Sequence, residues 1–250
     1  MTSTLPHIPI DSSANATHGV CVGCRNDSPF ELAFEFAYQP IVDFSSRTIF
    51  GHETLVRWIN GESAASILAQ VNDSNRYRFY QLCRVKALQV AARLGMLEFL
   101  SINFLPNAVY KPDVCIRTTF EAAREYNFPI EKIIFEVTEG ERVQDRPHLV
   151  TIFQQYRNFD FRTAIDDFGA GYASLNLLSE YQPDILKIDM GLIRNIDTDK
   201  ARQAIVKGIA LIGQELDIQL LAEGIETRAE RDFLFSIGID LMQGYWFSNW

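Results

Sequence analysis

Residues 184–222 have the sequence DILKIDMGLIRNIDTDKARQAIVKGIALIGQELDIQLLA, in which two short apolar runs flank a longer stretch with helical character. The runs are Asp184–Ile188 and Ile218–Ala222, and the stretch between them is Lys200–Leu216. Short apolar runs predict buried strands, and a helical crossover between two strands predicts that the strands are parallel. This part of the chain therefore predicts an α/β fold.

The same alternation extends over most of the chain. Further strands are predicted at Phe99–Asn103, Ile133–Val137, Phe161–Ile165 and Ile239–Met242, and further helices at Tyr77–Leu94, Arg117–Tyr126, Leu149–Asn158 and Arg228–Ile237. Two more strands, Phe36–Val42 and Thr48–Trp58, flank the polar turn Asp43–Arg47 and predict a hairpin. About eight strands in total predict a closed (β/α)8 barrel of the TIM type. An open doubly wound sheet is the alternative, but no glycine-rich dinucleotide fingerprint follows the first strand.

Length and composition favour one folded domain. The chain has 250 residues, of which 47% are hydrophobic, enough for one large core. Residues 1–29 are rich in Ser, Thr, Asn and Pro, so we expect an irregular segment there and a folded domain over residues 30–250. No apolar run approaches the ~20 residues of a membrane span, and the start of the chain lacks a secretory pattern. We therefore expect no membrane contact and a cytoplasmic location.

The net charge and the cysteines limit which classes of ligand and metal the chain is expected to bind. The net charge of −9 argues against a nucleic-acid polymer, although metals or a few arginines could still recruit a small anion. Cys21 and Cys24 could form half of a zinc site or a redox pair, but no second pair follows at a suitable spacing, which favours no such function. Cys83 and Cys115 lie in predicted helices and are expected in the core.

Polar residues occur at the end of nearly every predicted strand. They are Glu53, Asn103, Glu136, Asp166, Asp167, Lys187, Glu223 and Gln243. Each one alone also fits an ordinary strand end or helix cap. In a β/α barrel, however, the carboxyl ends of all strands meet at one mouth, where several carboxylates would repel one another unless cations offset them.

The types of metal-binding side chain at the strand ends indicate which cation they would bind. None of the four histidines, His7, His18, His52 and His148, ends a core strand. Oxygen donors without convergent Cys or His favour Mg²⁺ or Mn²⁺ over zinc. Two such ions close together suit phosphoester hydrolysis, so the residues predict a metal-dependent phosphodiesterase or related hydrolase.

From about Phe34 onward, the chain resembles the EAL-domain family of cyclic di-GMP phosphodiesterases. The signature tripeptide is Glu53-Thr54-Leu55, with Thr in place of the usual Ala, followed by Arg57-Trp58. Further matching motifs, in the expected order, are Tyr38–Ile41, Phe135–Glu139, Ile165–Leu175, Leu186–Asp189, Ala222–Thr227 and Gln243–Tyr245. Segment Asn60–Val71 is most similar to EAL domains attached to blue-light sensors, although we expect no flavin-binding domain ahead of it.

The resemblance implies hydrolysis of cyclic di-GMP to linear pGpG with two Mg²⁺ or Mn²⁺ ions per site, in a barrel with one antiparallel strand. Glu53, Asn103, Glu136 and Asp166 would bind one metal, and Asp167 would help to hold the second. Glu223 would be the general base, with Lys187 and Gln243 orienting water and phosphate. Gln39, Leu55, Arg57, Asp189 and Gln243 would bind the substrate.

The resemblance also bears on regulation. Glu139 would anchor the loop after the Asp166–Asp167 pair, through which the family is thought to couple dimerisation to activity. A homodimer is therefore expected, and a regulatory protein partner is compatible with the family. Two non-enzymatic alternatives stay open: a receptor that holds cyclic di-GMP without cleaving it, and a protein-interaction module independent of nucleotide. Degenerate EAL domains usually lose metal ligands or the base, whereas this sequence retains all of them.

Overall fold

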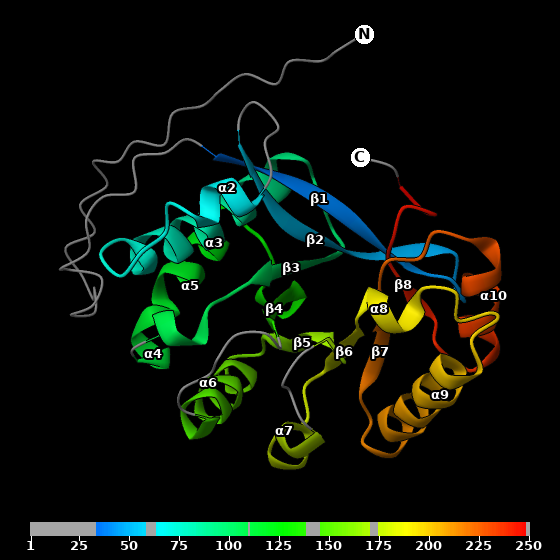
Figure 1. Ribbon diagram of the computed structural model, residues 1–250. Helices are drawn as coiled ribbons and strands as arrows, with labels where there is room; N and C mark the ends of the chain where they lie inside the picture. Colours follow the sequence, from blue (N-terminus) through cyan, green and yellow to red (C-terminus); the bar gives the residue numbers. More distant parts are fainter. Residues whose placement is uncertain (1–33, 59–63, 110, 139–145, 171–174, 249–250) are drawn as a thin grey trace, which may run out of the picture.

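The computed structural model describes residues 34–58, 64–109, 111–138, 146–170 and 175–248. Eight strands form a closed barrel in chain order, with helices around the outside (Figure 1), which confirms the predicted TIM-like fold. The strands are β1 Phe34–Asp43, β2 Thr48–Trp58, β3 Phe99–Asn103, β4 Ile133–Thr138, β5 Arg162–Phe168, β6 Ile185–Ile188, β7 Gln219–Ala222 and β8 Leu241–Met242. Only β1 is antiparallel to its neighbours, β2 and β8, as the resemblance implies.

The helices cover the outer face of the barrel. The α-helices are α2 Ala64–Leu68, α3 Arg76–Arg93, α4 Pro112–Cys115, α5 Arg117–Glu125, α6 Arg146–Asn158, α7 Leu175–Glu180, α8 Met190–Ile193, α9 Lys200–Glu215 and α10 Arg228–Ser236. Two 3-10 helices, η1 Pro106–Ala108 and η2 Ile130–Lys132, precede α4 and β4. Outward side chains of the strands pack against this layer; for example, the Phe135 ring lies 4.9 Å from that of Tyr156 in α6.

The inside of the barrel is closed at one level by small and branched apolar side chains. These are Ile41, Ile134, Ala164, Ile185, Leu221 and Leu241, each 1% exposed. Side chains in a strand alternate between its two faces, so the residue two positions further along points to the same side. The pairs related in this way are Ile134 and Glu136, Ala164 and Asp166, Ile185 and Lys187, Leu221 and Glu223, and Leu241 and Gln243. The predicted site residues therefore lie on top of the apolar layer, at the carboxyl ends of the strands.

Observed and predicted elements differ mainly at their ends. The last strand is two residues, Leu241–Met242, where four were predicted, and the short helices α2, α4, α7 and α8 were not predicted because they contain too few turns to show a period. Cys83 and Cys115 are buried on helices, as expected, whereas Cys21, Cys24 and the predicted domain start fall outside the described residues. In the part of the chain that is described, no helix has the length and apolar character that crossing a membrane requires.

Candidate functional site

The barrel mouth contains a buried ammonium group surrounded by four carboxylates. Lys187 is 1% exposed, and its Nζ lies 2.9 Å from Asp166 Oδ1 and 2.9 Å from Glu223 Oε1. The same atom lies 3.2 Å from Glu136 Oε2 and 3.3 Å from Glu53 Oε2. Each carboxylate comes from a different strand or strand end, so barrel closure brings together residues up to 170 positions apart in the sequence. We name these five side chains the Lys187 cluster.

Neutral amides and a hydroxyl hold the carboxylates in place. Ser101 Oγ donates to Glu136 Oε2 at 2.7 Å, and Asn103 Nδ2 donates to Glu136 Oε1 at 2.8 Å. Gln243 Nε2 donates to Glu53 Oε2 at 2.6 Å and to Gln39 Oε1 at 2.9 Å. These short hydrogen bonds restrict the rotamers of Glu53 and Glu136.

Asp167 reaches the mouth through an irregularity in β5. Neighbouring residues in a regular strand point to opposite faces, yet Asp166 and Asp167 both contribute to the same acidic site. The pairing of β5 with β6 shifts register between Ile165 and Phe168, and Asp167 has a left-handed φ of 55°. Non-glycine residues in this region cost free energy and cluster at functional sites, so we infer that the strain serves to aim the second aspartate.

Burial shifts the proton affinity of several of these groups. Burial raises the pKa of Glu136 to about 8 against the opposing charge of Lys187. Burial, followed by the charge of Asp166, raises the pKa of Asp167 to about 6. Burial also raises the pKa of Glu223, while it lowers that of Lys187; the surrounding carboxylates, Asp166 foremost, nevertheless hold the Lys187 pKa well above its usual value.

The charge of this site fits divalent cations. One ammonium faces five carboxyl groups, counting Asp167, and burial together with the neighbouring carboxylates raises the pKa of Glu136 and Asp167 despite the opposing charge of Lys187. Two sets of three carboxylates have oxygens within 4.8 Å of one another: Glu53, Glu136 and Asp166, and Asp166, Asp167 and Glu223. Asp166 belongs to both sets, so it could bridge two ions. Oxygen donors of this type match Mg²⁺ or Mn²⁺.

Metal binding should therefore be linked to proton release. Below pH 8, a metal ion must displace a proton from Glu136, and below pH 6 also from Asp167, so apparent affinity for Mn²⁺ is expected to rise from pH 6 to pH 8. Titration calorimetry at pH 7 in two buffers with different heats of ionisation would measure the protons released. Glu131→Gln, an exposed carboxylate elsewhere, is the matched control. An affinity independent of pH over this range would contradict the linkage.

The predicted substrate-binding residues line one cavity beside the cluster. This cavity has a volume of about 300 Å³, and Gln39, Leu55, Arg57, Asp189 and Gln243 all contribute to its wall together with Glu53, Asp166, Asp167 and Glu223. We name it the mouth cavity. A second, mostly apolar cavity of about 330 Å³ adjoins it on the side of α2 and α3 and shares Glu53, Leu55 and Asp166. The two cavities flank the carboxylates, which leaves room for an elongated ligand across them.

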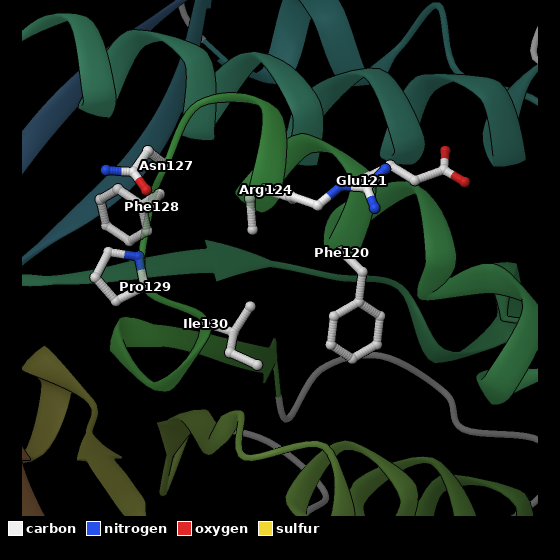
Figure 2. Close-up of a pocket in the computed structure, with 8 residues that line it drawn as sticks. Phe120, Glu121, Arg124, Asn127, Phe128, Pro129 and Ile130 are labelled. Atoms are coloured by element: carbon white, nitrogen blue, oxygen red, sulfur yellow. The ribbon is translucent and has the colours of Figure 1, made fainter.

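A larger hollow lies outside the mouth, and its chemistry differs. It has a volume of about 660 Å³, and Figure 2 shows Phe120, Pro129 and Ile130 around it with Glu121 and Arg124 on α5. Glu121 is the one carboxylate in its lining, so it lacks the grouped carboxylates and the buried cation of the mouth. Chemistry rather than size therefore places the site at the barrel mouth.

Some predictions concern residues that the structure does not describe, and some site residues were not predicted. Glu139 lies outside the described residues, so its role stays a prediction. Ser101 was missed, although a serine two positions before Asn103 in an apolar strand is a usable signal of the same inward face. Met190, Glu226 and Tyr245 also line the mouth cavity and were missed. Glu226 and Tyr245 lie inside the motifs Ala222–Thr227 and Gln243–Tyr245, which is a usable signal, whereas nothing in the local sequence marks Met190.

Comparison with known proteins agrees with this geometry. Residues 30–249 match the family described as EAL domain. The blue light- and temperature-regulated antirepressor BluF of Escherichia coli is 34% identical over 216 residues, covering 86% of this chain and 53% of BluF. The probable cyclic di-GMP phosphodiesterase PdeN of Escherichia coli is 27% identical over 229 residues, covering 86% and 43%. The chain thus spans about half the length of these relatives.

Solved structures of EAL proteins are also similar to this chain. A standalone versatile EAL protein from Vibrio cholerae O395, in a c-di-GMP-bound form, is 54% identical with a TM-score of 0.84, covering 86% of this chain and 91% of that one. BlrP1 of Klebsiella pneumoniae, in a complex with calcium and cyclic di-GMP, is 33% identical with a TM-score of 0.81, covering 86% and 55%. A complex of BlrP1 with manganese and cyclic di-GMP has a TM-score of 0.80.

Proposed function

The chain belongs to the EAL-domain family, and on this premise we propose that it hydrolyses cyclic di-GMP to linear pGpG with the help of two divalent cations. The observation that carries the proposal is the Lys187 cluster: four carboxylates from separate strands converge on one buried ammonium, directly beside a cavity lined by Arg57. Relatives named as cyclic di-GMP phosphodiesterases and neighbours with the nucleotide bound support the choice of substrate.

In the proposed reaction, a water oxygen attacks phosphorus and one P–O bond to a ribose 3′ oxygen breaks. That oxygen takes up a proton from solvent and leaves as a hydroxyl. Glu223 accepts the proton of the attacking water, since at 15% it has the most exposed side chain of the four carboxylates in the Lys187 cluster and it lines the mouth cavity. Arg57 contacts a phosphate oxygen. Lys187 fixes the positions of the Glu223 and Asp166 carboxylates through its two contacts of 2.9 Å. When bound, two divalent cations would neutralise the phosphodiester and lower the pKa of water. Glu53, Asn103, Glu136 and Asp166 would hold one cation, and Asp167 together with Asp166 would hold the other.

Product formation from cyclic di-GMP tests the proposal. We expect linear pGpG to appear with Mg²⁺ or Mn²⁺ and not in the presence of a chelator. Glu53→Ala removes a ligand that is also hydrogen-bonded by Gln243, so metal affinity should fall by at least about 10-fold, and turnover should be lost at limiting metal. The exposed-site variant Glu131→Ala is the control. Turnover by Glu53→Ala equal to that of the unmodified protein would refute the ligand assignment.

One alternative has a specific observation behind it. BluF is named an antirepressor, which raises a role in which the chain holds cyclic di-GMP and acts through a protein partner. The intact set of carboxylates at the mouth argues for the enzyme, because a receptor needs neither grouped metal ligands nor a base. Tight nucleotide binding without any pGpG, at saturating Mg²⁺ and Mn²⁺, would favour the receptor.

A further inference from the structure

A guanidinium group is buried in the helical layer without a charged partner. Arg84 in α3 is 4% exposed, and it lies on the face of the helix that packs on the core, because Ala87 and Leu88, three and four positions later, are 0% exposed. No carboxylate of the described residues forms an ion pair with Arg84. A buried charge without a counter-charge is strongly unfavourable, so the fold is expected to offer Arg84 a counter-ion.

The hydrogen-bonding atoms around this group are also unsatisfied. Within the described part of the chain, Nε and Nη1 of Arg84 and the hydroxyl of Tyr156 are buried and have no hydrogen-bond partner. Tyr156 lies in α6 and is 0% exposed. Burial raises the pKa of Tyr156 to about 12 against the opposing charge of Arg84, so the two groups lie close together and the hydroxyl keeps its proton at neutral pH. Buried polar atoms in native proteins are nearly always hydrogen-bonded, so three such atoms in one place indicate a bound partner.

The types of donor select the class of that partner. Two guanidinium N–H groups and one phenolic O–H all donate, and the site carries a positive charge, so a metal cation does not fit. A water molecule could accept these hydrogen bonds but would leave the charge of Arg84 uncompensated. The rings of Phe104 and Phe135, with centroids 5.6 Å and 4.9 Å from that of Tyr156, make the surroundings apolar, which strengthens the attraction between opposite charges. An anion is therefore the occupant that satisfies both the hydrogen bonds and the charge.

We propose that Arg84 and Tyr156 hold a buried chloride ion between α3 and α6. None of the cavities described above has Arg84 in its wall, which favours a single-atom anion over a phosphate or a nucleotide. The proposal does not depend on the proposed function, because the site lies in the helical layer and shares no residue with the Lys187 cluster. The two helices come together only in the folded barrel, so chloride binds the folded state and stabilises it.

Thermal unfolding in different salts tests the proposal. Sodium chloride or bromide would replace sodium isethionate, an organic anion much larger than chloride, at constant ionic strength and fixed Mg²⁺. The Tm of the unmodified protein should rise with saturation, by about 3–6 °C at about ten times the Kd for chloride. Arg84→Met should lose this rise, and its Tm in isethionate should be no lower than that of the unmodified protein, because the unpaired charge is gone. Tyr156→Phe removes one donor to the ion and should weaken chloride binding about 10-fold or more.

Arg93→Met, an exposed position at the end of α3, is the matched control and should keep the full chloride response. A saturable rise in Tm that disappears in Arg84→Met and is weakened in Tyr156→Phe would support the site. The absence of a saturable rise in the unmodified protein, or an equal loss of the rise in Arg93→Met, would overturn it. If Arg84→Met fails to fold, Tyr156→Phe decides, and an unchanged affinity for chloride in that variant would overturn the site.

Discussion

Replacing Glu223 with glutamine is expected to lower kcat for cyclic di-GMP by about 10²–10⁴-fold while nucleotide binding is retained, the usual loss when a general base is removed. The amide cannot accept the proton of the attacking water. It does retain an oxygen that can accept from Lys187 Nζ, a contact of 2.9 Å in the unmodified protein, so the cluster should keep its arrangement. Steady-state rates at saturating Mn²⁺ and calorimetric binding of cyclic di-GMP measure the two effects separately.

The matched control is Glu215→Gln, an exposed residue at the end of α9 that should turn over normally. Glu223 also belongs to one of the two possible metal sites, so its role as base has to be separated from a role as ligand. If the rate of Glu223→Gln recovers as Mn²⁺ concentration is raised, Glu223 acts as a ligand and the assignment as base is wrong. A rate that stays low at every Mn²⁺ concentration supports the base.

Much of the fold could be predicted because central strands such as β4 and β6 are apolar on both faces apart from one charged residue. Glu136 is the one charged residue in the run Ile133–Val137. Lys187 likewise lies between apolar residues in Asp184–Ile188. A charged residue inside such a run is rarely buried without a partner. Alternation of side chains then places it above the apolar layer, which the structure confirms for both residues.

The parts that sequence could not predict depend on backbone geometry and on contacts between distant segments. Two adjacent aspartates, Asp166 and Asp167, should point to opposite faces of a regular strand, and only the register shift and left-handed Asp167 bring both to the mouth. Met190 and Tyr245 both line the mouth cavity, where Gly224 packs closely against Met190 and Gly244 packs closely against Ile225. Such an approach has no local signature. Dimerisation, the cytoplasmic location and the role of Glu139 stay predictions.

Lys187→Met should destabilise the metal-free protein by about 3–5 kcal/mol at pH 8, the typical cost of removing one partner from a buried set of charges. Methionine has a similar length but leaves Glu53, Glu136, Asp166 and Glu223 without their common cation. Urea unfolding in the presence of a chelator measures the change. Lys200→Met, at the exposed start of α9, is the control for the loss of a lysine.

The pH dependence gives the sharper test, because its sign follows from the carboxyl groups. The folded-state pKa of Glu136 is about 8, above its unfolded value, so the folded state holds a proton that the unfolded chain has already released, and stability falls as pH rises toward 8. Without Lys187 the carboxyl pKa values rise further and this fall becomes steeper. The difference in unfolding free energy between Lys187→Met and the unmodified protein should therefore be small at pH 5 and large at pH 8, and added Mn²⁺ should reduce it at pH 8. An equal difference at both pH values would mean that Lys187 contributes packing rather than charge, and the electrostatic account of the site would have to be abandoned.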